Sequence, residues 1–301
     1  MRTAFIQELI VQARLHPEIF FVVGDLGYSV VEPFANEFPD RFLNAGVAEQ
    51  NMTGVAAGLA SEGWHVFTYS IANFPTLRCF EQIRNDIAYH NLPVTVVAVG
   101  AGMAYGSLGY SHHAVQDIAV IRALPEIAVL SPADPGETRE CVQWLSANPC
   151  PSYLRLGKAG EPNLHTVSGG AGGPLEIIHG DGRCAIVTMG SILKVALDAA
   201  AVLAGEGIRI SVFSCPWLQP KGPDSLAPLL KFDLLIAMEE HLRAGGFASL
   251  LSEKMPDGTR IKSLALPESV CGEVGSQEYL RGLGGLDAAS VAAVVRQSLR
   301  K

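Results

Sequence analysis

Short runs of β-branched and other apolar residues alternate with longer stretches of helical periodicity along the whole chain. In the first half, four such runs lead into Gly or Ser; they are 20–23, 66–69, 94–99 and 127–130. The second half repeats the rhythm with runs at 184–189, 208–213 and 234–238, and Leu193–Leu203 between them has a helical period. Buried strands alternating with helices are typical of a parallel sheet covered by helices. The pattern therefore predicts two tandem α/β domains, each built on a parallel sheet.

A glycine-rich segment separates the two halves. Ser168–Pro174 reads SGGAGGP, which offers no packing side chain and leaves the backbone free to turn. The chain has 301 residues, enough for two domains of the usual size of about 100 to 200 residues. We therefore place the boundary in this segment and predict domains at 1–170 and 171–301.

Composition and charge exclude several classes of protein. Glu8 and Arg14 fall inside the apolar periodicity of the first 18 residues, so this stretch predicts an amphipathic helix and not a signal peptide. The longest nearly uncharged run, 94–109, is too short and too rich in glycine to span a bilayer. With a net charge of −8 and scattered Lys and Arg, no surface for nucleic acid or anionic membrane is indicated. The six cysteines form no CxxC pair and predict reduced thiols, so we expect a soluble cytoplasmic protein.

Two further motifs do not support a site on their own. The segment Gly100–Gly106 follows an apolar strand and looks like a nucleotide-binding glycine turn, but no clean amphipathic helix opens after it. We expect a mobile loop over a pocket. His112 and His113 have no third ligand nearby in the sequence, and Ser111 lacks the GxSxG pattern of serine hydrolases, so no metal site or serine nucleophile is predicted.

The most informative stretch is RFLNAGVAEQNM at 41–52, followed by the small-residue helix TGVAAGLA at 53–60. A helix rich in Gly and Ala gives up helix propensity, which makes sense where another backbone or a flat ligand approaches closely. Glu49 lies at the beginning of this helix. On composition alone, a solvated or helix-capping glutamate is the simpler interpretation, because acidic residues favour the first helical turn.

Four segments together resemble the pyrimidine-binding domain of transketolases. They are GVAEQNM, FEQIRN at 80–85, GYSHH at 109–113 and SPAD at 131–134, in the same order and at similar spacing. The resemblance runs from about Arg2 to Gly157. A weaker match continues through the second half, including Glu239–His241 and Gly245-Gly246. As a whole, the chain resembles the C-terminal subunit of split transketolases.

This resemblance implies a site for thiamine diphosphate. Glu49 matches the glutamate that hydrogen-bonds N1′ of the aminopyrimidine, and Phe74 matches an aromatic residue that stacks on this ring. His112 matches the active-site histidine that contacts the substrate oxygen, with His113 as the competing candidate. Two further arginines, Arg2 and Arg155, match anion-binding residues, although either could equally be a structural ion pair.

Three positions depart from the transketolases that act on phosphorylated sugars. Ile71 stands at a cofactor-binding position where a second stacking aromatic is usual. Gly100 replaces a phosphate-contacting histidine, and Leu108 replaces an acidic residue that reads a donor hydroxyl. These departures favour a substrate that is less phosphorylated, deoxygenated or larger than pentose phosphates, with room for it above 100–109. The sequence does not identify the donor or the acceptor.

The diphosphate and magnesium site of the family is missing. Gly180-Asp181-Gly182 looks like its opening triplet, but the closing asparagines are absent, so we interpret it as a turn between strands 175–178 and 184–189. The resemblance therefore implies an N-terminal partner subunit that holds Mg²⁺ and the diphosphate, most simply in an α2β2 assembly. Together the two subunits would move a two-carbon ketol unit from a ketose to an aldehyde. Two alternatives stay open: the β subunit of a 2-oxo acid dehydrogenase, and a non-catalytic regulatory partner with this fold.

Overall fold

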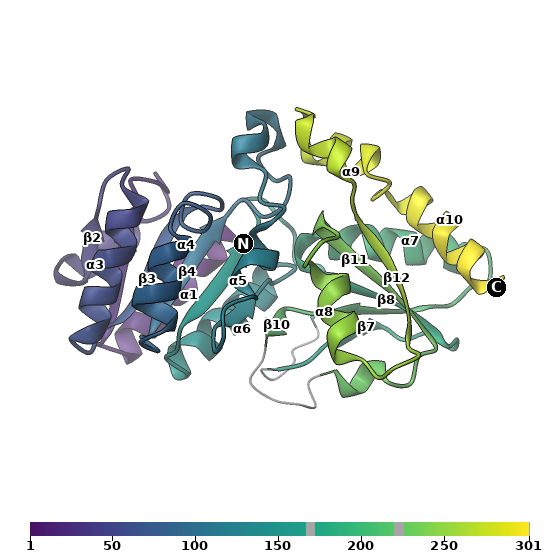
Figure 1. The fold of residues 1–301 in the computed structure, drawn as a ribbon, viewed down its shortest axis with the longest axis horizontal. Coiled ribbons are helices and arrows are strands. Elements are labelled where there is room, and N and C mark those ends of the chain that lie inside the picture. Colours follow the sequence, from purple (N-terminus) through teal and green to yellow (C-terminus); the bar gives the residue numbers. More distant parts are fainter. Residues whose placement is uncertain (167–171, 220–225, 301) are drawn as a thin grey trace.

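The computed structural model describes residues 1–166, 172–219 and 226–300, which form two α/β halves side by side (Figure 1). The first half contains a seven-stranded sheet in the order β10-β5-β6-β4-β3-β1-β2. Six of its strands are parallel: β1 (Ile19–Val23), β2 (Phe42–Asn44), β3 (His65–Ile71), β4 (Val94–Val99), β5 (Ala128–Leu130) and β6 (Ser152–Leu156). The predicted parallel sheet is confirmed, whereas the sequence pattern missed β2 and β6.

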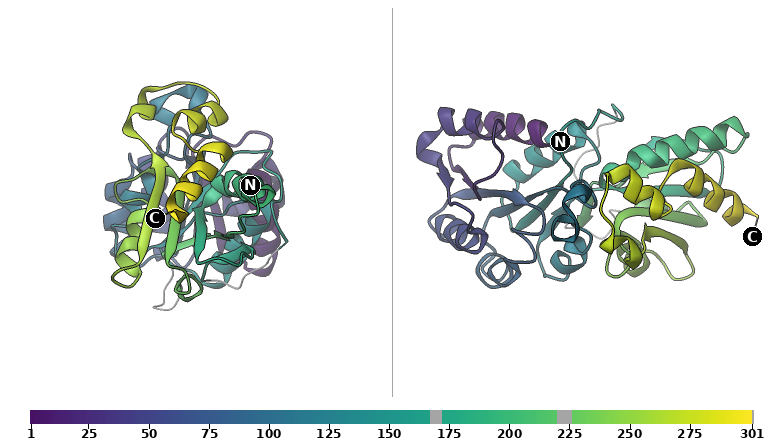
Figure 2. Two further views of the ribbon diagram at one scale, coloured as in Figure 1. Left: turned by 90° about the vertical axis from the view of Figure 1, so that its right-hand side faces the viewer. Right: turned by 90° about the horizontal axis from the view of Figure 1, so that it is seen from above.

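Helices cover both faces of this sheet, as Figure 2 shows from above. One apolar cluster joins the strands to α1 (Arg2–Leu15), α2 (Glu32–Glu37) and α6 (Pro135–Ala147). A second cluster on the opposite face joins them to α3 (Glu49–Ser61), the π-helical turn η2 (Ile83–Ala88) that continues α4 (Phe80–Gln82), and α5 (Asp117–Ile121). The first half is therefore a three-layer α/β domain, as the alternation of runs predicted.

The second half contains a five-stranded sheet in the order β12-β11-β8-β9-β7. The strands are β7 (Leu175–Ile178), β8 (Cys184–Met189), β9 (Ser211–Ser214), β11 (Leu234–Leu242) and β12 (Arg260–Leu266). All are parallel except β7, which runs antiparallel to β9. The triplet at 180–182 does connect β7 to β8, as predicted, but these two strands are not neighbours in the sheet.

Four α-helices lie in the described residues of the second half. They are α7 (Leu193–Gly205), α8 (Phe247–Lys254), α9 (Gln277–Leu283) and α10 (Ala288–Leu299). The described 3₁₀ turns of the chain are η1 (Pro39–Arg41), η3 (Gly106–Leu108), η4 (Tyr110–His112), η5 (Gly190–Ile192), η6 (Ala227–Leu229) and η7 (Glu268–Gly272). None of the helices in the described ranges is both long and apolar enough to cross a bilayer.

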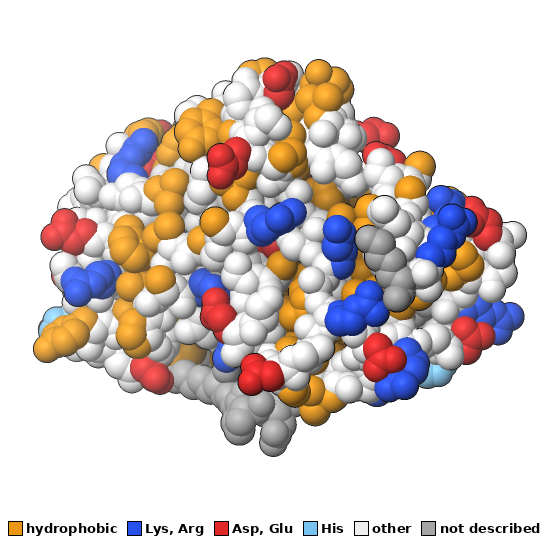
Figure 3. Space-filling view, turned by 45° about the vertical axis from the view of Figure 1, so that its right-hand side comes forward, with side chains coloured by type: hydrophobic (Ala, Val, Ile, Leu, Met, Phe, Trp, Pro, Cys, Tyr) orange, Lys and Arg blue, Asp and Glu red, His pale blue; other side chains and the backbone are white. Residues whose placement is uncertain are grey.

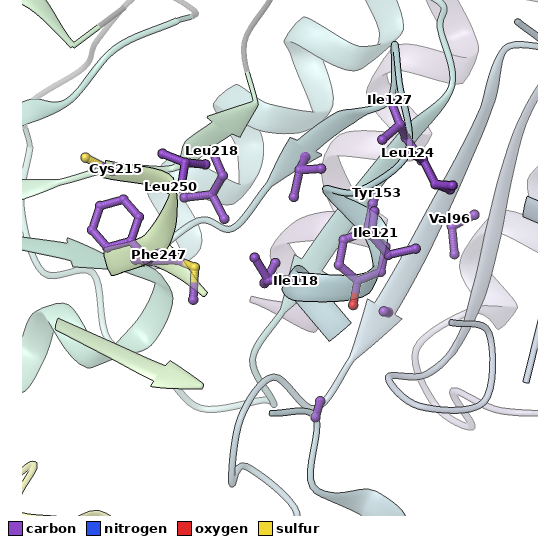
Figure 4. Packing of buried hydrophobic residues seen from close by; sticks show 14 of the residues in the cluster. Val96, Ile118, Ile121, Leu124, Ile127, Tyr153, Cys215, Leu218, Phe247 and Leu250 are labelled. Atoms are coloured by element: carbon purple, nitrogen blue, oxygen red, sulfur yellow. The ribbon is translucent and has the colours of Figure 1, made fainter. Parts of the chain in front are cut away.

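Apolar packing joins the two halves into one continuous core. Ile118 and Ile121 of α5 belong to the same buried cluster as Phe247 and Leu250 of α8 (Figure 4). The short strand β10 (Trp217–Gln219) comes from the second half but pairs antiparallel with β5 of the first sheet. The predicted boundary falls largely on 167–171, outside the described residues, and the division at 170/171 stays a prediction.

Buried His65 predicts a specific loss of stability in acid. Its side chain is 2% exposed at the start of β3, and its ring centroid lies 4.7 Å from that of Phe67. Burial lowers the pKa of His65 from 6.5 to about 4, and Glu18 offsets only part of this effect. Because the folded-state pKa lies below the unfolded value, stability is complete above pH 6.5 and falls as the pH drops toward 4. At about 1.4 kcal/mol per pH unit, the free energy of unfolding should fall by about 2 kcal/mol between pH 6.5 and pH 5.

The measurement is urea unfolding at pH 7 and pH 5. We expect His65→Leu to lose about 2 kcal/mol less than the wild type between these two pH values. His90→Gln, which removes an exposed histidine, should show the full wild-type loss. Equal losses in the wild type and His65→Leu would contradict the assignment.

Candidate active site

Three of the predicted site residues follow the carboxyl ends of strands β2, β3 and β4 in the first sheet. Glu49 begins α3 after β2, Phe74 lies in the loop after β3, and His112 ends η4 in the segment that follows β4. In an open parallel sheet, ligands bind outside the carboxyl ends of the strands. The topology therefore brings together three residues that are far apart in sequence.

Glu49 presents a buried carboxylate at the beginning of α3. It is 1% exposed, although it carries a charge at the first helical position, where the helix dipole favours an anion. The Ser70 hydroxyl donates to Oε1 at 3.3 Å, and Arg78 Nη1 donates to Oε2 at 2.6 Å. The Arg78 side chain is 48% exposed, so this cation approaches the carboxylate from the solvent side.

Phe74 lies between Arg78 and His112. The Arg78 guanidinium carbon is 4.8 Å from the centroid of the Phe74 ring, within the range of a cation–π contact. The Phe74 ring also meets the His112 ring edge-on, with centroids 5.3 Å apart and an interplanar angle of 73°. Glu49, Arg78, Phe74 and His112 thus form one contiguous cluster, which we call the Glu49 cluster.

His112 and His113 occupy different environments. His112 is half-buried, and its Nδ1 lies 3.0 Å from the Ser111 hydroxyl. Burial, assisted by the neighbouring His113, lowers the pKa of His112, so its imidazole is neutral at pH 7. His113 is fully buried, with Nε2 3.4 Å from the Gly106 carbonyl oxygen. Of the two, His112 lies beside Phe74, while His113 packs inside the segment that carries it.

The domain composition decides the family. The transketolase pyrimidine-binding domain matches residues 1–160, and the transketolase C-terminal domain matches residues 173–291. The chain belongs to the transketolase family. It carries the two domains that form the C-terminal part of transketolases, as the sequence motifs predicted.

Several similar proteins are named as a subunit or a section of a transketolase. One subunit of the apulose-4-phosphate transketolase of Actinobacillus succinogenes is 32% identical, over 87% of this chain and 86% of that protein. A putative transketolase C-terminal section of Methanocaldococcus jannaschii is also 32% identical, over 100% of this chain and 96% of its own length. A solved split-gene transketolase, described as an inactive beta4 tetramer, superposes with a TM-score of 0.84 at 33% identity, covering 99% of this chain and 97% of that one. These matches favour the C-terminal subunit of a split transketolase over the two alternatives that the sequence left open.

The two arginines that were compared with transketolase anion-binding residues do not join the Glu49 cluster. Arg155 is 2% exposed; its Nε donates to Asp117 Oδ2 at 2.8 Å, and its Nη2 donates to the Ala114 carbonyl oxygen at 2.7 Å. This geometry is that of a structural ion pair, and the substrate role that the resemblance implies for Arg155 stays a prediction. Arg2 lies half-buried in the first turn of α1, and no hydrogen bond within the described ranges links it to Glu49 or His112.

The space expected above Gly100 is filled, which corrects the sequence interpretation. Gly100 has φ +101°, and a Cβ added there would collide with the ring of Tyr105. The glycine thus makes way for an aromatic ring of the same segment and does not open room for a larger substrate. Leu108, the other departure in this segment, is 55% exposed on η3.

Arg78 is the site residue that sequence reasoning missed. It reaches Glu49 across 29 positions of sequence. A single arginine in a loop looks like a solvated side chain until the fold places a buried carboxylate beside it. Ile71, by contrast, lies next to the cluster through the backbone, because its carbonyl oxygen accepts a hydrogen bond from the Phe74 N–H at 2.8 Å.

Proposed function

We propose that this chain is the C-terminal subunit of a two-chain, thiamine diphosphate-dependent transketolase that moves a two-carbon ketol unit from a ketose to an aldehyde. The observation that carries the proposal is the Glu49 cluster, in which a buried carboxylate, an aromatic face and a neutral imidazole meet at the carboxyl ends of parallel strands. When bound, thiamine diphosphate supplies the nucleophilic carbon that attacks the donor's carbonyl group. The side chains of this subunit orient reactants and hold protons around it.

The residues present fit an aminopyrimidine ring. Glu49 Oε2 already accepts a hydrogen bond from the planar N–H donor of Arg78, and a protonated ring nitrogen is a donor of the same kind. Because Arg78 is half exposed, it can withdraw to solvent at small cost when the ring arrives. Glu49 would then hold the proton at N1′ of the pyrimidine, while the Phe74 face stacks on the ring and Ile71 lies against it.

His112 supplies acid/base chemistry toward the substrate. A neutral imidazole can accept a proton from a hydroxyl group and return it to a carbonyl oxygen, which is the exchange that carbon–carbon cleavage and formation require. The lowered pKa of His112 keeps this neutral form present at physiological pH. Its contact with Phe74 places it at the border of the proposed ring site, where the substrate would lie.

The proposal includes a partner subunit that holds Mg²⁺ and the diphosphate. Within the described ranges, no group of three or more His, Cys, Asp or Glu could hold a metal ion. Gly54 and Gly58 of α3 are exposed, and an added Cβ would meet nothing within 4 Å, so this small-residue face is open for close backbone packing. Figure 3 shows both basic and acidic side chains on one face of the molecule. We infer an α2β2 assembly in the cytoplasm.

The reaction class is tested with a mixture of this chain and an N-terminal transketolase section. One assay supplies a ketose phosphate together with an aldose, and the other supplies a 2-oxo acid. We expect ketol transfer to the aldose without release of CO₂. Xylulose 5-phosphate with ribose 5-phosphate is the reference pair. A kcat/KM below about 10⁴ M⁻¹s⁻¹ for this pair would support the prediction from Leu108 that the natural substrate is not an ordinary pentose phosphate. Release of CO₂ from the 2-oxo acid without ketol transfer would contradict the proposal.

A further inference from the structure

The glycine-rich segment 100–109 fits closely against the second half of the chain. At Gly102 (φ +61°), an added Cβ would lie 2.6 Å from the side chain of Glu240 and 2.9 Å from its carbonyl oxygen. At Gly106, it would collide with Leu280 of α9 and lie 2.8 Å from the Gly275 carbonyl oxygen. Gly102 and Gly106, two of the glycines that looked like a nucleotide-binding turn, are therefore explained by close approach of the C-terminal domain.

Glu240 makes the central contact. It lies on β11 and is 3% exposed. Its Oε1 accepts a hydrogen bond from the Met103 backbone N–H at 2.7 Å, and its Oε2 accepts one from Arg281 Nε at 2.8 Å. Gln277 Nε2 donates to both oxygens, at 3.0 and 3.1 Å. One buried carboxylate thus ties the segment after β4 to helix α9.

The same segment carries His112. Gly102 and Ala114 exchange two backbone hydrogen bonds, of 3.1 and 2.9 Å, so residues 103–113 form a closed loop with Met103 at its base. On the side of the Glu49 cluster, Asn73 Nδ2 donates to the carbonyl oxygens of Ser111 and His113, at 3.1 and 2.9 Å. The side chains of Asn73 in the first domain and Glu240 in the second thus both hold the loop, and the Gly275 N–H adds a hydrogen bond to the Gly106 carbonyl oxygen at 3.3 Å.

We propose that Glu240 is a positioning residue, through which the C-terminal domain holds the 103–113 loop and thereby sets the place of His112 beside Phe74. This inference rests on the proposed function only for the role of His112. The contact itself is independent of any reaction. The C-terminal domain would thus influence the active site indirectly, through Glu240 and the 103–113 loop.

The first measurement is amide hydrogen exchange of residues 103–113 in the full chain, without substrate. We expect Glu240→Ala to speed exchange in this loop by about 10-fold or more, because the Met103 N–H loses its acceptor and opening becomes easier. Glu240→Gln should restore most of the protection, since an amide oxygen can still accept this hydrogen bond. Glu278→Ala, which removes an exposed carboxylate from α9, should leave exchange unchanged. Unchanged exchange in Glu240→Ala would overturn the proposal.

The second measurement separates positioning from folding. In the two-chain complex, we expect Glu240→Ala to lower kcat for ketol transfer by about 10- to 100-fold, while hydrogen–deuterium exchange at cofactor C2, the task of Glu49, keeps its wild-type rate. Faster loop exchange with an unchanged kcat would overturn the positioning role. Amide exchange of the loop is measured without substrate. It therefore tests the contact between Glu240 and Met103 even if the two-chain complex shows no ketol transfer.

A second variant serves if Glu240→Ala does not fold. Gly102→Ala places a methyl group against Glu240, and Gly285→Ala is its matched control, because Gly285 has a similar φ of +69° but nothing within 4 Å of an added Cβ. Both substitutions strain the backbone to a similar degree. We expect only Gly102→Ala to speed loop exchange and lower kcat. Equal effects of the two variants would overturn the proposal.

Discussion

Replacing Glu49 by glutamine is expected to lower kcat of the two-chain complex by about 100- to 1,000-fold while leaving the fold intact. This is the cost typical of removing one preorganised polar group from an active site, about 3 to 4 kcal/mol. An amide cannot favour a proton on N1′ of the pyrimidine as a carboxylate does. The fold should survive because Glu49→Gln removes the buried charge itself, so half-exposed Arg78 can turn to solvent and no buried charge is left unpaired.

The readout is hydrogen–deuterium exchange at cofactor C2, measured together with kcat and the thermal midpoint. Glu81→Gln, which changes an exposed glutamate of α4, serves as the matched control and should behave like the wild type. A wild-type rate of C2 exchange in the Glu49→Gln complex would refute the role of Glu49 in holding the pyrimidine proton.

Replacing Arg155 by methionine is expected to destabilise the chain by about 3 to 5 kcal/mol, because it leaves the charge of Asp117 buried without its cation. Asp117 is fully buried, and its Oδ2 accepts hydrogen bonds from Arg155 Nε at 2.8 Å and from the Tyr153 hydroxyl at 2.7 Å. Burial acts to raise the pKa of Asp117, but Arg155 and His241 outweigh it and hold this pKa below its ordinary value.

Denaturant unfolding of the single and double variants tests this ion pair. Asp117→Asn combined with Arg155→Met should be less destabilised than Arg155→Met alone, since no buried charge then remains unpaired. An Arg155→Met variant with wild-type stability and a raised KM for substrate would contradict the structural assignment and support the anion-binding role that the family resemblance implied.

Most strands could be predicted from the sequence because most buried strands are themselves continuous runs of apolar or neutral residues. Val94–Val99 and Cys184–Met189 are uninterrupted apolar or neutral runs that end at a glycine, and β4 and β8 have these same bounds. Strand β6 escaped prediction because Arg155 lies within it. An arginine inside a strand indicates an exposed edge unless a partner for it is known, and that partner, Asp117, belongs to another element.

In the candidate site, too, the residues that belong to local motifs could be predicted, whereas contacts between distant segments could not. Glu49 and His112 could be proposed because each lies in a short motif that resembles transketolases, and Phe74 because it falls at the matching position between two of these motifs. The ion pair of Arg78 with Glu49 and the seating of Gly102 against Glu240 depend on contacts between distant segments, and single-sequence patterns do not encode them. Gly100 was misinterpreted for the same reason, because only the fold shows that the Tyr105 ring occupies the space beside it.

The dependence of this subunit on a partner is tested most directly by calorimetric titration of thiamine diphosphate with Mg²⁺. The titration is made into this chain alone and into its mixture with an N-terminal transketolase section. We expect saturable binding only in the mixture, because we assign only the pyrimidine side of the site to this chain, and its described residues include no group of three or more His, Cys, Asp or Glu that could hold a metal ion. Tight binding of thiamine diphosphate and Mg²⁺ to the isolated chain would contradict a cofactor site shared between two subunits.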